Sequence, residues 1–229
     1  MSDRPVRIAI GVLLVVAGIC YSSWLLEFVV DTGLDPIHSF LSELEAPDRP
    51  YRDWFEYGDV ITGSCTLIAA VAGLVCLPPR QLYSTVGWVA LAVFGGATIA
   101  DSQAPVGCVP APAHPCPDEP SGLLPQLHHL HALTSTIAVT AIFVAMVSFT
   151  LTARRDRRWP TMGSLGLVLL VLIAVATVWM GLSSILDTDW ALGVAQRIQV
   201  GGMSLWLITL GVAIGQSSFR PARTGPPGP

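Results

Sequence analysis

The sequence predicts an all-α membrane protein, built as a bundle of six transmembrane helices. Hydrophobic residues make up 52% of the chain and charged residues only 12%, whereas a soluble domain carries about 25% charged residues. The apolar residues also form long blocks, and several blocks reach the length of about 20 residues that a membrane-spanning helix needs. This composition outweighs the length of 229 residues, which alone would suggest one or two soluble domains.

Six blocks are long enough to cross a membrane. The first, residues 8–30, is interpreted as a helix and not as a cleaved signal peptide, because it is too long and lacks a small-x-small cleavage site before Glu27. The others span about residues 54–77, 82–100, 127–152, 162–185 and 192–216. Residues 1–217 therefore form one domain, with loops at about 31–53, 102–126 and 186–191. The Pro- and Gly-rich tail, 218–229, is expected to be disordered.

The placement of arginine predicts that both termini are cytoplasmic. With the N-terminus inside, nine of the twelve basic residues lie in cytoplasmic segments, and only Arg49, Arg52 and Arg197 lie outside, as the positive-inside rule requires. The absence of lysine, beside abundant Ala, Gly, Pro and Val, indicates a high-GC bacterial genome. We therefore expect a multi-pass protein of the bacterial plasma membrane, in contact with membrane lipids. The net charge of −4 argues against a nucleic-acid partner, which requires a basic face.

The loop between the third and fourth blocks carries two cysteines, Cys108 and Cys116, flanked by prolines. In an oxidising compartment this arrangement predicts a disulfide that closes a short loop. A zinc site built on the same two thiols with His114 is the alternative, although zinc sites usually contain a more closely spaced cysteine pair.

Ionisable residues gather at the outer ends of five of the predicted helices. Such residues are costly inside or at the rim of a membrane span, so they normally face a cavity or one another. They are Glu27, Glu56, Asp59, Asp101, His128, His131 and Arg197. We predict that Asp59, Asp101, His131 and Arg197 converge in one outward-opening cavity, with Arg197 paired to Asp59 or to Asp101.

These residue types suggest a metal site. His128 and His131 share one helix face, and with Asp101 and His38 they supply the ligands that a catalytic zinc uses. Zinc would lower the pKa of a bound water, with Asp101 or Asp59 as ligand or general base. The first hypothesis is therefore an outward-facing, metal-assisted hydrolase of a lipid or lipid-linked envelope molecule. Its candidate catalytic residues are Asp59, Asp101 and Arg197.

Other hypotheses use the same segments. Ser39 and Ser42 beside His38 suggest a Ser–His nucleophile, although no nucleophile-elbow glycines surround them. A non-enzymatic binding or transport-accessory protein would use the acidic pocket for a cationic headgroup or a proton. A polar network that only joins the helix ends is a further alternative. The Gly211-x-x-x-Gly215 pair favours close helix approach and a homodimer.

Residues 42–63, SELEAPDRPYRDWFEYGDVITG, resemble the first-loop and second-helix signature of a bacterial six-helix membrane family. That family is catalogued as a domain of unknown function (the 998 family). Asp101, the two loop cysteines, the histidine and Thr-Ser of the fourth helix, and Gly193…Gln196-Arg197 are similar to its actinobacterial members. The resemblance covers nearly the whole chain. It implies six helices with an exported paired-cysteine loop, and no established activity.

More distantly, the chain is similar to the membrane hydrolases that include the alkaline ceramidases. In those enzymes Ser, Asp and three His assemble a zinc site within seven helices. Residue by residue, this likeness implies a role for Asp101, His128, His131 and His38.

Overall fold

The computed structural model describes residues 4–47, 49–77, 82–106, 130–156, 159–186, 188 and 190–217. Within these ranges every regular element is a helix. The elements are α1 (Arg4–Cys20), η1 (Ser23–Phe28), η2 (Leu41–Glu45), α2 (Arg52–Cys76), α3 (Leu82–Ser102), α4 (Leu130–Asp156), α5 (Pro160–Ile185) and α6 (Leu192–Gln216), where η denotes a 3₁₀ helix. The predicted all-α bundle of six long helices is confirmed.

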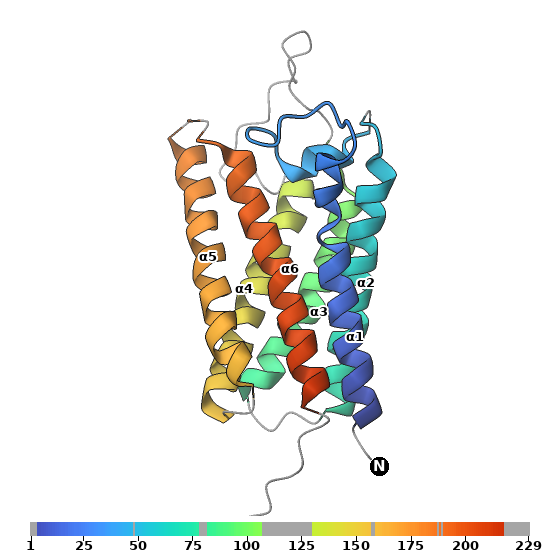
Figure 1. The fold of residues 1–229 in the computed structure, drawn as a ribbon, viewed down its shortest axis with the longest axis vertical. Helices are drawn as coiled ribbons and strands as arrows, with labels where there is room; N and C mark the ends of the chain where they lie inside the picture. Colours follow the sequence, from blue (N-terminus) through green and yellow to red (C-terminus); the bar gives the residue numbers. More distant parts are fainter. Residues whose placement is uncertain are drawn as a thin grey trace, which may run out of the picture.

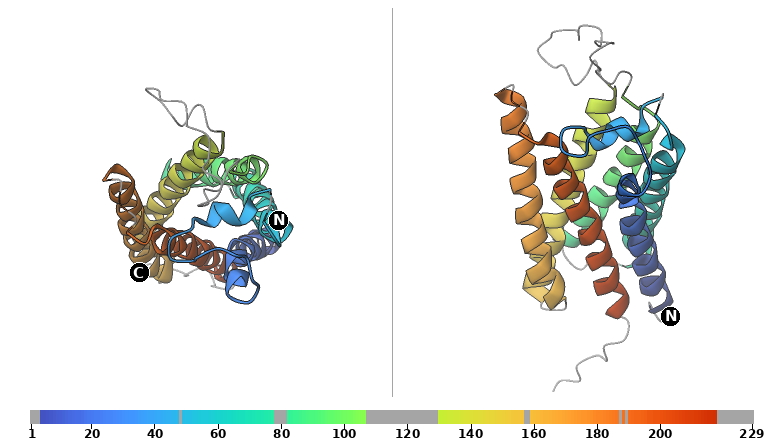
Figure 2. Two further views of the ribbon diagram at one scale, coloured as in Figure 1. Left: turned by 90° about the horizontal axis from the view of Figure 1, so that it is seen from above. Right: turned by 45° about the horizontal axis from the view of Figure 1, so that its top comes forward.

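The six long helices form a closed ring (Figures 1 and 2). Each packs against its neighbours in the chain, and α6 returns to pack against α1. Successive helices run in opposite directions, so α1 begins and α6 ends at the same end of the bundle. All six spans, with η1 completing the first, are long and apolar enough to cross a membrane. The chain is therefore a multi-pass membrane protein, and its predicted orientation in the membrane stays a prediction.

The first span is not the single continuous helix that we expected over residues 8–30. Its α-helical part ends at Cys20, and the chain continues as the tighter η1. The Ser22 hydroxyl donates a hydrogen bond to the Gly18 carbonyl at 3.0 Å, and such back-bonding competes with the regular helix ladder. The change of helix type brings Glu27 inside, where only 7% of the residue is exposed.

Glycines allow α1 and α6 to cross closely. A Cβ atom added at Gly211 would lie 2.6 Å from the carbonyl oxygen of Gly11, and one added at Gly11 would lie 2.6 Å from that of Gly211. Gly211 thus serves packing inside the bundle. A homodimer stays a prediction, and it would need a surface other than this one.

The half of the bundle nearest the chain termini has a solid interior. Phe94, Phe149 and Trp206 are fully buried. Trp88 packs edge-on against Phe149, with ring centroids 5.0 Å apart, and Phe149 contacts Trp206 at 6.2 Å. These large side chains fill the ring from within. A pocket of about 210 Å³ at this end of the bundle is lined only by residues 159–165 and 208–217, so it lies between α5 and α6 and not at the centre of the ring.

Candidate functional site

The chain between η1 and α2 crosses the end of the bundle opposite the termini. Seen from above, η2 lies over the middle of the helix ring (Figure 2). Leu44 is 1% exposed and Ala46 is 4% exposed, so this segment packs inward like a core element. The Glu43 carboxylate accepts a hydrogen bond from the Phe40 amide at 3.0 Å and caps η2. We call residues 36–47 the lid.

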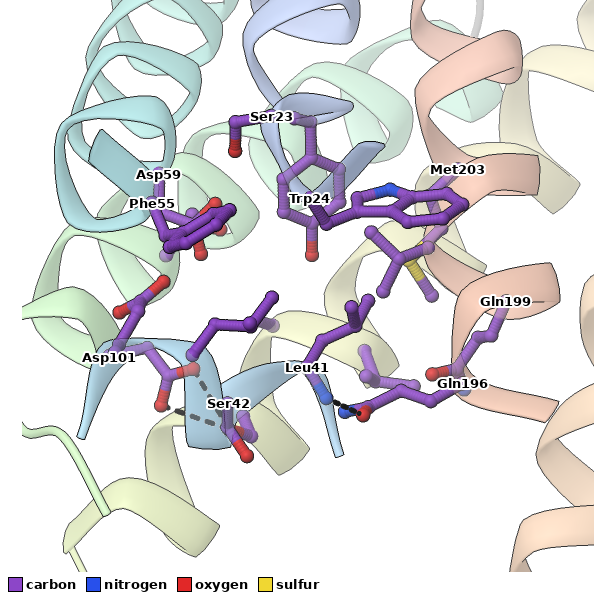
Figure 3. A pocket seen from close by; sticks show the side chains of 18 of the residues that line it. Ser23, Trp24, Leu41, Ser42, Phe55, Asp59, Asp101, Gln196, Gln199 and Met203 are labelled. Atoms are coloured by element: carbon purple, nitrogen blue, oxygen red, sulfur yellow. Dashed lines mark hydrogen bonds between the residues drawn. The ribbon is translucent and has the colours of Figure 1, made fainter. Parts of the chain in front are cut away.

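A cavity of about 100 Å³ lies beneath the lid. Its walls come from Tyr21, η1, η2 and the helices α2, α3, α4 and α6, so it lies within the ring beneath η2 (Figure 3). The polar and aromatic residues that line it are Tyr21, Ser23, Trp24, Ser42, Glu45, Phe55, Asp59, Thr98, Asp101, His131, Ser135, Gln196 and Gln199. Three of the four residues predicted to converge, Asp59, Asp101 and His131, are among them.

Asp101 is the most heavily bonded carboxylate in the cavity. The Ser135 hydroxyl lies 2.9 Å from both of its oxygens, and the Thr134 hydroxyl donates to Oδ1. His131 Nδ1 lies 3.1 Å from the same Oδ1. Positions 131, 134 and 135 share one face of a helix, so the first turns of α4 hold Asp101 as a unit. This arrangement fixes both the carboxylate and the imidazole.

Glu45 and Asp59 form a second acidic pair, joined by a side-chain hydrogen bond. Two carboxyl groups share a hydrogen bond only when one of them is protonated. Burial, followed by the negative charges of Asp59 and Asp101, raises the pKa of Glu45 from 4.5 to about 9. The pair therefore holds a proton at neutral pH.

Glu45 is a site residue that the sequence analysis missed. A loop carboxylate normally points into solvent, and nothing in its immediate neighbours marks it as buried. The available signal is the spacing of Leu41 and Leu44, three residues apart in an otherwise polar segment. Apolar residues at this spacing favour a helical turn with one buried face.

Arg197 does not pair with Asp59 or Asp101, so that prediction is wrong. Its Nε and Nη2 each donate to a different oxygen of Glu27 at 2.6 Å. Its Nη1 donates to the Ser39 carbonyl at 2.8 Å and to its own helix. Arg197 therefore stands outside the cavity lining, because the 3₁₀ turn of η1 brings Glu27 to it first.

The predicted zinc ligands are only partly brought together. Asp101 and His131 are in contact, whereas the half-exposed His38 lies on the lid, with Nε2 3.8 Å from Asp35 Oδ2, and does not line the cavity. His128 lies outside the described residues. Within the described part of the chain, no three His, Cys, Asp or Glu side chains form a group able to hold a metal ion.

The predicted disulfide, Cys108–Cys116, and the alternative ligand His114 also lie outside the described residues. The disulfide stays a prediction, which mass spectrometry under non-reducing conditions will test. Two free thiols would contradict it.

Comparison with known proteins places the chain in a family. The family model described as "Protein of unknown function (DUF998)" matches residues 14–213, which extend from within α1 to the last turn of α6 and include the lid. No curated protein and no solved structure shows significant similarity to the chain, so the likeness to the alkaline ceramidases stays a hypothesis. The chain therefore belongs to the DUF998 family.

Proposed function

We propose that the cavity is an outward-facing binding site that exchanges a bound proton for a cationic amino group. The observation that carries this proposal is the charge of the lining. Three carboxyl groups, Glu45, Asp59 and Asp101, surround the single imidazole of His131, and none of the described lining residues is an arginine. The chain contains no lysine. The outward direction rests on the distribution of arginine along the sequence.

The charges explain why a cation would replace a proton. The negative charge of Asp101 is offset by the basic His131 imidazole at 3.1 Å. Glu45 and Asp59 are instead joined through a proton that they share in a hydrogen bond. Removing that proton leaves two adjacent carboxylates in a buried site, where like charges are strongly unfavourable. A cation in the cavity offsets this repulsion, so cation binding and proton release are linked.

The aromatic lining favours an organic ammonium group. Tyr21, Trp24 and Phe55 line the same cavity as the carboxyl groups (Figure 3). An ammonium group over an aromatic face gains about 0.5–2 kcal/mol. At about 100 Å³ the cavity is smaller than the roughly 300–1,000 Å³ of typical ligand pockets. It suits an amino headgroup rather than a whole lipid.

The solid half of the bundle supports binding rather than a through-path for ions. Phe94, Phe149 and Trp206 fill the ring between the cavity and the end that holds the chain termini. The cavity is therefore a dead end in this conformation. A receptor or accessory role fits it better than a channel.

Titration calorimetry with methylammonium tests the proposal. Measured in two buffers of different ionisation enthalpy at neutral pH, binding should release up to about one proton per site through linkage. Asp59→Asn should abolish both binding and release. Asp35→Asn, a matched change at an exposed position directly before the lid, should leave them unchanged. Absence of binding to wild type, or binding unaffected by Asp59→Asn, would contradict the proposal.

The amino group has two potential sources, a soluble amine and a lipid headgroup. The same titration in nanodiscs of phosphatidylcholine, with or without phosphatidylethanolamine, separates them. Weaker methylammonium binding in the presence of phosphatidylethanolamine identifies the headgroup as a competitor. Equal binding in both identifies a soluble amine.

The contact between Asp101 and His131 favours a second candidate, the metal-assisted hydrolase of a lipid or lipid-linked molecule. These two residues would supply two zinc ligands, and a third would have to come from outside the described residues. Metal analysis of purified wild type and His131→Ala separates the candidates. Stoichiometric zinc that is lost in His131→Ala favours the hydrolase.

A further inference from the structure

Three hydrogen bonds fasten the lid to the start of α6. The Gly193 amide donates to the Ile37 carbonyl at 3.0 Å, and Arg197 Nη1 donates to the Ser39 carbonyl at 2.8 Å. The third bond runs from the Leu41 amide to Gln196 Oε1 at 2.6 Å (Figure 3).

The spacing of these bonds gives the contact its specificity. The lid residues are 37, 39 and 41, which run from the turn at residues 36–38 to the start of η2. The α6 residues are 193, 196 and 197, which share one face of a helix. The bonds from Arg197 and to Gln196 also satisfy partly buried backbone groups of the lid.

Arg197 has a geometry in this contact that lysine cannot reproduce. Two of its nitrogens bind the Glu27 carboxylate at 2.6 Å each, and this fixes the guanidinium plane. The third nitrogen is thereby aimed at the Ser39 carbonyl. An ammonium group lacks such a planar fork of donors. One side chain therefore links η1, α6 and the lid.

The fastened part of the lid determines where Glu45 lies. Glu45 follows Leu41 by one turn of η2, and α6 comes so close that a Cβ atom at Gly193 would lie 2.5 Å from the Ser39 carbonyl oxygen. Glu45 then faces ionisable groups from several elements: Tyr21 directly after α1, Glu56 and Asp59 on α2, Asp101 on α3 and His131 on α4. If residues 37–41 move, Glu45 leaves Asp59.

We infer that Arg197 and Gln196 are positioning residues that hold Glu45 beside Asp59, and that this placement makes cation binding depend on pH. The inference rests on the proposed function, since it assigns the regulation of the same site. The linkage works through one proton. When Glu45 lies beside Asp59, a cation must displace the proton that the two carboxyl groups share. When Glu45 has moved away, a cation can bind without displacing that proton.

The test compares Arg197→Lys and Gln196→Ala with Gln216→Ala, a matched glutamine at the other end of α6. The first readout is labelling of Ser42→Cys by a membrane-impermeant maleimide in each background, located by mass spectrometry. We expect several-fold faster labelling in Arg197→Lys and Gln196→Ala, and the wild-type rate in Gln216→Ala. Gln196→Ala removes no charge, so it remains informative if Arg197→Lys fails to fold. Unchanged labelling in both variants would show that Arg197 and Gln196 do not hold the lid.

The second readout is the pH dependence of methylammonium affinity, measured without the cysteine. For wild type the affinity should rise with pH by up to about tenfold per unit below the pKa of Glu45. Arg197→Lys, Gln196→Ala and Glu45→Gln should all flatten this rise, while Glu45→Gln keeps the slow labelling of a fastened lid. A wild-type slope in both Arg197→Lys and Gln196→Ala would refute the positioning role. If wild type binds no methylammonium, the proposed function fails, and the labelling still decides whether Arg197 and Gln196 hold the lid.

Discussion

At the residue scale, the site depends on how acids and bases are paired at the end of the bundle. Arg197 forms an ion pair with Glu27 through two hydrogen bonds, and His131 contacts Asp101. Glu45 and Asp59 are joined by a side-chain hydrogen bond. A buried acid without a cation retains a proton, so this last pair gives the cavity its expected sensitivity to pH.

Replacing Glu45 by glutamine should flatten the pH dependence of stability. Between 4.5, its ordinary pKa, and about 9 in the folded protein, Glu45 binds a proton in the folded state and not in the unfolded state. The free energy of unfolding therefore falls as pH rises through this window, by up to about 1.4 kcal/mol per pH unit. Thermal unfolding in detergent across the window measures this, and a Glu45→Gln profile as steep as that of wild type would contradict it.

Replacing Arg197 by alanine should be strongly destabilising, because it leaves the fully buried Glu27 carboxylate without its partner. Breaking a buried pair in this way costs about 3–5 kcal/mol. The control is Arg52→Ala, since Arg52 pairs with Glu56 at 3.1 Å but is 30% exposed, and such pairs contribute about 0.5 kcal/mol or less. Equal losses of stability in the two variants would refute the distinction.

Part of the site could be predicted from residue types alone. Asp59, Asp101 and His131 are ionisable residues at the ends of apolar helices, and the cost of burying them leads them to one cavity. The partner of Arg197 could not be predicted, because it depends on η1 being a 3₁₀ helix. Glu45 was missed because its burial arises from the docking of a loop.

At the element scale, the helices follow the sequence closely and the irregular segments do not. Apolar block length placed α6 at residues 192–216 and predicted α2 and α5 to within two residues at each end. The break in the first span and the turn η2 are not marked in the sequence by any pattern as strong as the length of an apolar block. Both segments form hydrogen bonds with α6, which lies more than 150 residues later in the chain.

Gly211→Ala should destabilise the bundle, whereas Gly215→Ala should not. An added Cβ at Gly211 meets a backbone oxygen at 2.6 Å, and one at Gly215 meets nothing within 4 Å. Overpacking of this kind costs about 1–3 kcal/mol. The unfolding of each variant in detergent is compared at one protein concentration. If only the oligomeric state changes, the pair serves a dimer and not the α1–α6 crossing.

At the scale of the whole molecule, a ring of helices is solid at one end and holds a lidded acidic cavity at the other. The distribution of arginine predicts that the solid end faces the cytoplasm. Labelling Arg155→Cys tests this, since Arg155 lies near the end of α4 at the solid end. The cysteine should react with an impermeant maleimide only after the cells are opened. Reaction in intact cells would invert the orientation and move the cavity to the cytoplasmic side.

The central claim is that the cavity stores a proton on the Glu45–Asp59 pair. Infrared spectroscopy of carboxyl groups tests it most directly, in purified wild type and Glu45→Gln, from about pH 6 to about pH 10 across the expected transition. The account predicts a protonated carboxyl band in wild type at neutral pH that disappears near pH 9, and whose transition is lost in Glu45→Gln. If wild type has no such band at neutral pH, or if Glu45→Gln retains the same transition, the pair does not hold the proton and the proposed exchange has no basis.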